Sequence, residues 1–171
     1  MKDDLAFVEQ NKKEMNTHEN YLKVAFEEAF IGMRNNKGGP FGAVVVLNDE
    51  IIGKGHNMVT SQNDPTAHAE IVAIRDACNS QQTFHLNNAV LYTTCEPCPM
   101  CLAAIYWANI RYIYYCYDRN DAANIGFSDK FIYEEFERPI NKRSVEMKKI
   151  QMQVPNDLFN EWKHKQDKMT Y

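Results

Sequence analysis

The sequence lacks an excess of basic residues, a long apolar run and an apolar N-terminal segment. It contains 19 lysines and arginines against 23 aspartates and glutamates, with a net charge of −4 and an isoelectric point near 5.7. This balance disfavours nucleic acid as a partner, because proteins that bind it neutralise phosphates with basic side chains. The longest apolar run, residues 100–108, is about half of what a bilayer crossing needs. These absences predict a soluble, cytoplasmic protein without a membrane or nucleic-acid partner.

Repeats, low-complexity tracts and Pro/Ser-rich linkers are also absent. A chain of 171 residues has the length of about one domain, and an apolar content of 44% supplies a sizeable core. We therefore expect one continuous domain over residues 18–171, preceded by an N-terminal extension of residues 1–17.

The apolar pattern alternates between helical and β-type segments. Two β-type runs flank the turn residues Asn48, Asp49 and Glu50 and predict a hairpin. Because helices separate the later strands, we expect an α/β fold with a mixed sheet of about five strands and helices on both faces. The predicted strands are residues 43–47, 51–55, 89–93, 110–117 and 145–154. The predicted helices are residues 18–33, one from Pro65, one from Pro97, 129–136 and 155–168.

The five cysteines are an odd number in a chain too long to need a disulfide scaffold. Cys98 and Cys101 lie at the start of one predicted helix, and His68 lies at the start of another. Because the N-termini of such helices emerge at one edge of a sheet, these residues can meet in space. One imidazole and two thiolates supply three zinc ligands and leave a fourth position for water, which is the arrangement of a catalytic site.

Glu70 lies two positions after His68. Such neighbours point apart within a regular helix, so both can face one site only if His68 lies at the irregular first turn. Asp64, Pro65 and Thr66 are typical of a helix start at that point. A carboxylate beside zinc that is not itself a ligand is placed to accept a proton from water and pass it on.

Other interpretations of the cysteines remain. A C-x-x-C pair by itself is more often a structural zinc clip. An iron–sulfur cluster would also use Cys95, but it usually needs four thiolates. Cys78 and Cys116 are too far along the chain to be obvious fourth ligands and are expected to be small core residues, and Cys95 is expected to be a buried strand-end residue.

The segments Pro-Thr-Ala-His-Ala-Glu (65–70) and Cys-Glu-Pro-Cys-Pro-Met-Cys (95–101) closely resemble the zinc motifs of the cytidine and deoxycytidylate deaminase superfamily. Within this superfamily, residues 38–43, 104–108 and 121–133 are similar to the small bacterial guanine deaminases. The resemblance extends from about residue 18 to the end of the chain.

This resemblance implies a three-layer cytidine-deaminase-like fold and a hydrolase of purine metabolism that converts guanine to xanthine and ammonia. Zinc would be held by His68, Cys98 and Cys101. Hydroxide would attack carbon 2 of guanine, and Glu70 would protonate the adjacent ring nitrogen and later the departing amine. The implied substrate-binding residues are Phe41, Asn57, Ala69, Trp107, Asp129 and Tyr171. A homodimer is implied, with C-terminal segments from about residue 155 at the interface and possible exchange of these segments.

Other functions use the same zinc centre. A tRNA adenosine deaminase must bind an RNA loop, which the acidic composition disfavours. Guanosine or cytosine is a further candidate substrate. A zinc-stabilised binding module without turnover is the alternative outside the enzymes, and it would not need a carboxylate at Glu70.

Overall fold

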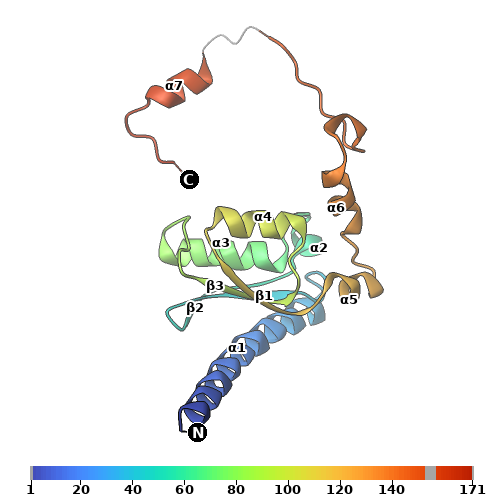
Figure 1. Ribbon diagram of the computed structural model, residues 1–171. Coiled ribbons are helices and arrows are strands. Elements are labelled where there is room, and N and C mark those ends of the chain that lie inside the picture. Colours follow the sequence, from blue (N-terminus) through green and yellow to red (C-terminus); the bar gives the residue numbers. More distant parts are fainter. Residues whose placement is uncertain (1, 153–156, 171) are drawn as a thin grey trace. The chain divides into compact units, whose positions relative to one another are not determined.

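The computed structural model describes residues 2–152 and 157–170 (Figure 1). Its internal contacts divide the chain into two compact units, residues 1–129 and residues 130–171. We call these the N-terminal unit and the C-terminal unit. Of the predicted site residues, only Tyr171 is not in the N-terminal unit, and it lies outside the described residues.

The N-terminal unit contains a mixed sheet with the strand order β2-β1-β3-β4. Its strands are β1 (Gly42–Leu47), β2 (Glu50–His56), β3 (Val90–Cys95) and β4 (Tyr112–Tyr117). Strand β1 is antiparallel to both β2 and β3, whereas β3 and β4 are parallel. The predicted mixed sheet is confirmed with four strands where about five were expected. The fifth was expected at residues 145–154, of which the described part, 145–152, forms no strand.

The hairpin between β1 and β2 closes through Asn48 and Asp49. Both residues have positive φ, at 51° and 64°. A two-residue turn of this kind matches the twist of its flanking strands, and Asn and Asp tolerate the left-handed conformation better than most residues. The turn residues therefore explain why the predicted hairpin forms.

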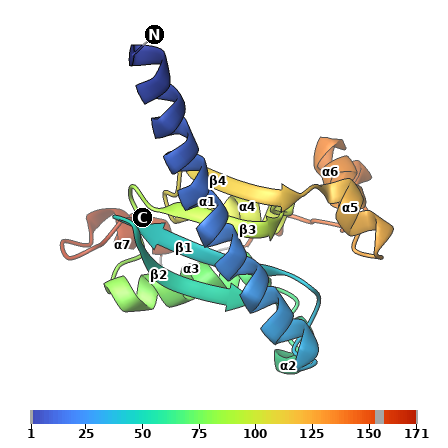
Figure 2. The ribbon, with the colours of Figure 1, turned by 90° about the horizontal axis from the view of Figure 1, so that it is seen from below.

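Helices cover both faces of the sheet. Figures 1 and 2 show α1 (Lys2–Arg34) on one face and α3 (Ala69–Gln81) with α4 (Pro99–Trp107) on the other. The three-layer α/β architecture is thus confirmed. The helix predicted at residues 18–33 is the second half of a longer helix, because α1 continues through residues 17 and 18 without a break.

The alternation of side chains in β1 supplies both halves of the core. Ala43 and Val45 pack in a cluster with residues of α3 and α4, whereas Val44 and Val46 pack with Tyr92 on the face that carries α1. Glycine in β2 then lets α3 approach closely. A methyl group at Gly55 would lie 2.4 Å from the backbone oxygen of Ala69, so the first turn of α3 lies directly against the strand.

Shorter elements complete the two units. The N-terminal unit also contains α2 (Val59–Gln62) and α5 (Arg119–Asn124). The C-terminal unit contains α6 (Lys130–Glu137), the 3₁₀ helix η1 (Ile140–Lys142) and α7 (Leu158–His164). The helix predicted at 155–168 is found as α7, which begins after its cap Asp157 and ends at His164; residues 155 and 156 lie outside the described residues. None of the described helices is both long and apolar enough to cross a membrane.

Candidate active site

The candidate site lies where α3 and α4 begin. His68 is the N-cap of α3 and Cys98 is the N-cap of α4, and both have extended backbone conformations. The turn before α3 is fixed by Asp64, whose Oδ1 accepts hydrogen bonds from the backbone N and the Oγ1 of Thr66 at 2.8 and 2.7 Å. His68 therefore precedes the regular helix, which is the condition for His68 and Glu70 to face the same site.

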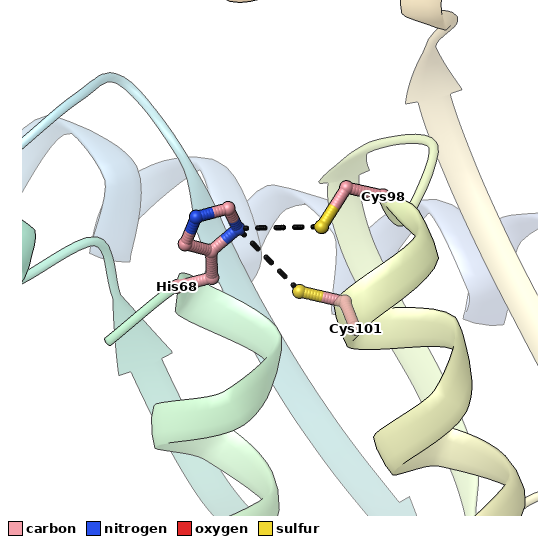
Figure 3. A group of neighbouring side chains, drawn as sticks. All are labelled: His68, Cys98 and Cys101. Carbon is pink, nitrogen blue, oxygen red and sulfur yellow. Dashed lines mark hydrogen bonds between the residues drawn. The ribbon is translucent and has the colours of Figure 1, made fainter. Parts of the chain in front are cut away.

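Figure 3 shows His68, Cys98 and Cys101 pointing toward one another from the two helices. His68 Nδ1 lies 3.6 Å from Cys98 Sγ and 3.5 Å from Cys101 Sγ. The three potential ligand atoms all lie within 4.8 Å of one another. A tetrahedral zinc ion with ordinary Zn–N and Zn–S bonds separates a nitrogen and a sulfur ligand by about 3.6 Å. The donor set and its spacing therefore fit zinc.

Hydrogen bonds within the cluster shift the pKa values of the two thiols in opposite directions. Hydrogen bonding from Cys101, followed by that from His68, lowers the pKa of the Cys98 thiol to about 4. The hydrogen bond with Cys98, together with burial, raises the pKa of Cys101. The hydrogen bond with Cys98 also raises the pKa of His68. Zinc binds thiolates and a neutral imidazole, so metal binding to this cluster is expected to release protons.

Glu70 lies in the first turn of α3 and is buried, with 6% of its surface exposed. Its Oε1 accepts a hydrogen bond from Thr93 Oγ1 at 3.3 Å, and its Oε2 accepts one from Cys101 Sγ at 3.5 Å. Burial is the main cause that raises the pKa of Glu70. A carboxyl group with a raised pKa beside a metal site is suited to accepting and returning a proton. Thr93, which orients it, carries no signal in the sequence.

Asn57 lies at the end of β2 and is also buried. Its Oδ1 accepts hydrogen bonds from the backbone N–H groups of Gly39 and Val59, both at 3.2 Å. The side-chain oxygen is thus used by two backbone donors. The Nδ2 amide hydrogens of Asn57 are the groups that could bind a ligand. A methyl group at Gly38 would lie 2.1 Å from this oxygen, which explains a glycine there.

Phe41 directly precedes β1 and packs against the core. Its ring contacts that of Phe127 edge to face, with ring centroids 5.0 Å apart. Asp129 is half-buried at the end of the N-terminal unit. Its negative charge contributes to the raised pKa of His68, although less than the hydrogen bond with Cys98. Phe127 was not among the predicted site residues.

Ala69 and Trp107 are the other two predicted substrate-binding residues that the structure describes. Ala69 is fully buried in the core as the first residue of α3. Trp107 ends α4, six residues or about 9 Å of helix beyond the cluster residue Cys101. Although it ends an apolar helix, Trp107 is not a core residue, because 66% of its surface is exposed. Trp107 thus lies at the opposite end of α4 from the N-cap residue Cys98.

The remaining cysteines lie outside the metal cluster. Cys95 is buried at the end of β3, and its Sγ donates to the backbone oxygen of Asp118 at 3.6 Å. Burial is the first cause that raises its pKa to about 12, which keeps a thiol protonated. Cys78 packs at the edge of the core, but Cys116 is exposed, which contradicts the prediction of a core residue. All five cysteines are free thiols.

Comparison with known proteins defines the class of the molecule. The sequence profile described as "Cytidine and deoxycytidylate deaminase zinc-binding region" matches residues 15–117. The chain belongs to this zinc-dependent deaminase family.

The relatives of this chain within the family include guanine deaminases and tRNA-specific adenosine deaminases. The guanine deaminase of Bacillus subtilis is 44% identical over 90% of this chain and 99% of its own length. Its crystal structure superimposes with a TM-score of 0.86 and covers 90% of this chain and 98% of that chain. The tRNA-specific adenosine deaminase of Bacillus subtilis is 41% identical over 57% of this chain, which spans 60% of that relative. A guanine deaminase structure from Nitrosomonas europaea is 28% identical, with a TM-score of 0.61 and 64% coverage of each chain.

Proposed function

We propose that this protein is a zinc-dependent guanine deaminase, a hydrolase that converts guanine to xanthine and ammonia. The observation that carries the proposal is the extent of the likeness to the Bacillus subtilis guanine deaminase, which spans nearly the full length of both chains. The likeness to tRNA-specific deaminases is confined to little more than half of the chain. We assign residues 18–171 to the deaminase domain, and we assign residues 1–17 to an extension that precedes it.

His68 Nδ1, Cys98 Sγ and Cys101 Sγ would hold the zinc. When bound, zinc lowers the pKa of a water ligand to about 7 and so supplies hydroxide at neutral pH. Cys101 also donates to Glu70, which connects the ligand set to the proton-transfer group. The two cysteines must be reduced for this purpose, which suits the cytoplasmic location that we propose.

Glu70 would move the protons of the reaction. Its buried carboxylate would take the first proton of the attacking water and deliver it to the ring nitrogen next to carbon 2. It would then take the second proton of that water from the hydroxyl group now on carbon 2 and give it to the departing amine. Thr93 holds one carboxylate oxygen, which limits rotation of the group between these positions. The raised pKa of Glu70 supports this role, because a group that both accepts and donates a proton works best near the operating pH.

The base would be bound by residues on three sides. Asn57 would donate from its amide N–H groups to an acceptor on the base edge, Phe41 would form an apolar wall, and Asp129 would accept from the amino side of guanine. Ala69 would contribute backbone between His68 and Glu70. These contacts combine a donor and an acceptor, as discrimination of a purine by its polar edge requires.

Asn57→Asp should raise the KM for guanine by about 10- to 100-fold with little change in thermal stability. The aspartate oxygen can still accept from Gly39 and Val59, but the N–H donors toward the base are replaced by an acceptor. Steady-state kinetics and thermal unfolding would measure both effects. Asn20→Asp, at an exposed position of α1 where the side chain only accepts a hydrogen bond, is the matched control. An unchanged KM in Asn57→Asp would contradict the proposed contact.

We also propose that the protein is a homodimer in which C-terminal segments from about residue 155 help to close the sites, with exchange between subunits. Several aromatic side chains of α4 and β4 are exposed in the single chain and would be covered in a dimer, among them Tyr106, Trp107, Tyr112 and Tyr115. Trp107 and Tyr171 would act in this setting rather than within their own chain. Sedimentation equilibrium tests the dimer, and a monomer at micromolar concentration would refute it.

A substrate panel tests the proposed function. The purified, zinc-loaded protein would be offered guanine, guanosine, cytosine, adenine and a tRNA that carries a wobble adenosine, and ammonia release would be followed. We expect release from guanine at a kcat/KM at least about 100-fold above the others. Release from the tRNA alone would instead favour the tRNA adenosine deaminase, and release from none would leave a zinc-binding module.

A further inference from the structure

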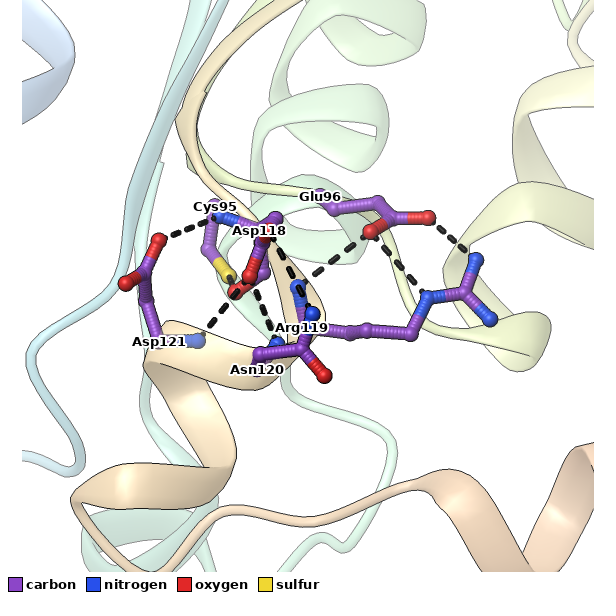
Figure 4. Close-up of polar contacts among 6 residues, drawn as sticks. All are labelled: Cys95, Glu96, Asp118, Arg119, Asn120 and Asp121. Carbon is purple, nitrogen blue, oxygen red and sulfur yellow. Dashed lines mark hydrogen bonds and ion pairs between the residues drawn. The ribbon is translucent and has the colours of Figure 1, made fainter.

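A polar network outside the metal cluster joins the loop that carries Cys98 to the start of α5. Figure 4 shows its six residues, which come from two parts of the chain: Cys95, Glu96, Asp118, Arg119, Asn120 and Asp121. Glu96 lies two positions before the proposed ligand Cys98, and Arg119 is the first residue of α5. The network therefore lies between the metal site and the segment that leads to Asp129.

Glu96 and Arg119 make the central contact of this network. Glu96 Oε2 accepts from the backbone N and from the Nε of Arg119, both at 3.2 Å, and Oε1 accepts from its Nη2. A carboxylate that accepts from the Nε and the Nη2 of one guanidinium through its two oxygens fixes orientation as well as distance. The pair is partly exposed, with 21% of the Glu96 side chain and 44% of the Arg119 side chain accessible. Pairs of this exposure add little to global stability, so its geometry matters more than its strength.

The surrounding contacts make this junction rigid. The backbone N of Glu96 donates to the oxygen of Tyr117 at 2.8 Å, and Cys95 Sγ donates to the oxygen of Asp118. Asp118 caps α5 in a reciprocal capping box with Asp121. The start of α5 is thus held to the metal loop at several points.

The same segment ends at Asp129. After α5 the chain turns at Gly126, whose φ is 93°, and Phe127 then packs on the ring of Phe41. Residues 119–129 are therefore held at their N-terminal end by the contact of Arg119 with Glu96, and near their C-terminal end by the contact of Phe127 with Phe41. Burial raises the pKa of Asp129, and the positive charge of Arg119 acts in the opposite direction, so this arginine lies within electrostatic range of the carboxylate.

From this arrangement we infer that Arg119 and Glu96 are positioning residues for substrate binding, and that their ion pair sets the place of Asp129 relative to the metal loop. The inference rests on the proposed function, since it assigns Asp129 to the substrate. Arg119 acts through the segment that it anchors and is not itself a catalytic residue. Its removal should change the binding of guanine more than the chemical step.

The first test measures the segment directly. Zinc-loaded wild type, Arg119→Met, Arg119→Lys and Glu96→Gln would be compared by hydrogen exchange, zinc content and thermal unfolding. In Arg119→Met and Glu96→Gln, amides of residues 120–128 should exchange at least about tenfold faster while α3 and α4 keep their rates and zinc stays bound. Arg119→Lys keeps the positive charge but not the two guanidinium contacts, so its exchange rates should lie between those of the wild type and of Arg119→Met. Arg111→Met, which removes an exposed arginine just before β4, is the matched control.

The second test asks whether the effect passes through Asp129. Arg119→Met should raise the KM for guanine by about tenfold and change kcat by less than about threefold. In the Asp129→Ala background the same substitution should raise KM by less than about twofold, because residues that act as a unit are not additive. An equal tenfold increase in both backgrounds would overturn the inference.

The two proposals can fail separately. If wild type does not release ammonia from guanine, the proposed function fails, and the exchange rates of residues 120–128 still decide whether the pair anchors the segment. If wild type is active but Arg119→Met and Glu96→Gln leave both these rates and the KM unchanged, the positioning role is refuted while the proposed function stands. A loss of zinc in Glu96→Gln would likewise refute it and show that Glu96 supports the metal loop alone.

Discussion

Glu70→Gln should keep zinc at the level of the wild type and lower kcat for guanine by about 100- to 10,000-fold, the range that general acid–base groups contribute. Glutamine has nearly the shape of glutamate, and its side-chain oxygen can still accept from Thr93. The amide cannot take a proton from water or return one to the base. The substitution thus removes the proposed proton transfer while it leaves the ligand set intact.

The measurements for Glu70→Gln are metal content, thermal unfolding and steady-state kinetics on one preparation. Because the carboxyl group is buried and its pKa is raised, a neutral amide should not lower the stability of the fold. Glu27→Gln, on an exposed position of α1, controls for the loss of one acidic charge. Full activity in Glu70→Gln would remove this residue from the mechanism, whereas loss of zinc would show that it serves the metal instead.

The parts of the fold that were predictable are those encoded in neighbouring residues. Asn48 and Asp49 suit the left-handed turn that they form, so the β1–β2 hairpin could be located. The start of α3 was predictable because Asp64 and Thr66 form their capping contacts within two residues. The joint presence of His68, Cys98 and Cys101 followed from the rule that such helices begin at one sheet edge. Local chemistry and topology were sufficient for the metal cluster.

Features that depend on distant contacts could not be predicted in this way. Thr93 orients Glu70 across 23 residues, and Arg119 meets Glu96 across the same separation. Neither pair has a periodic or spacing signal. Trp107 is exposed although it belongs to an apolar helix, because α4 packs on the sheet along one side only. The apolar pattern predicts that a helix is buried, but it does not tell which end or side faces the solvent.

Cys101→Ser should reduce bound zinc from about one ion per chain to a small fraction and reduce activity toward guanine by more than about 1000-fold. Cys101 is fully buried, and its Sγ lies 3.5 Å from His68 Nδ1. A serine hydroxyl holds its proton far more tightly than a thiol and is a poor zinc ligand. It can still donate to Glu70, so the fold should form.

Cys101→Ser also separates a catalytic zinc from a structural clip. Zinc that binds only the folded state raises its melting temperature, and a closed structural site supplies much of the folding free energy. In a catalytic site built on a core of this size, we expect the variant to unfold cooperatively a few degrees below the zinc-loaded wild type and to match the chelated wild type. Cys116→Ser, at an exposed position of β4, is the control and should keep zinc, stability and turnover. An unfolded Cys101→Ser beside an intact Cys116→Ser would mean that the metal holds the fold together. A fully zinc-loaded and active Cys101→Ser would instead remove Cys101 from the ligand set and reopen the interpretation of the whole cluster.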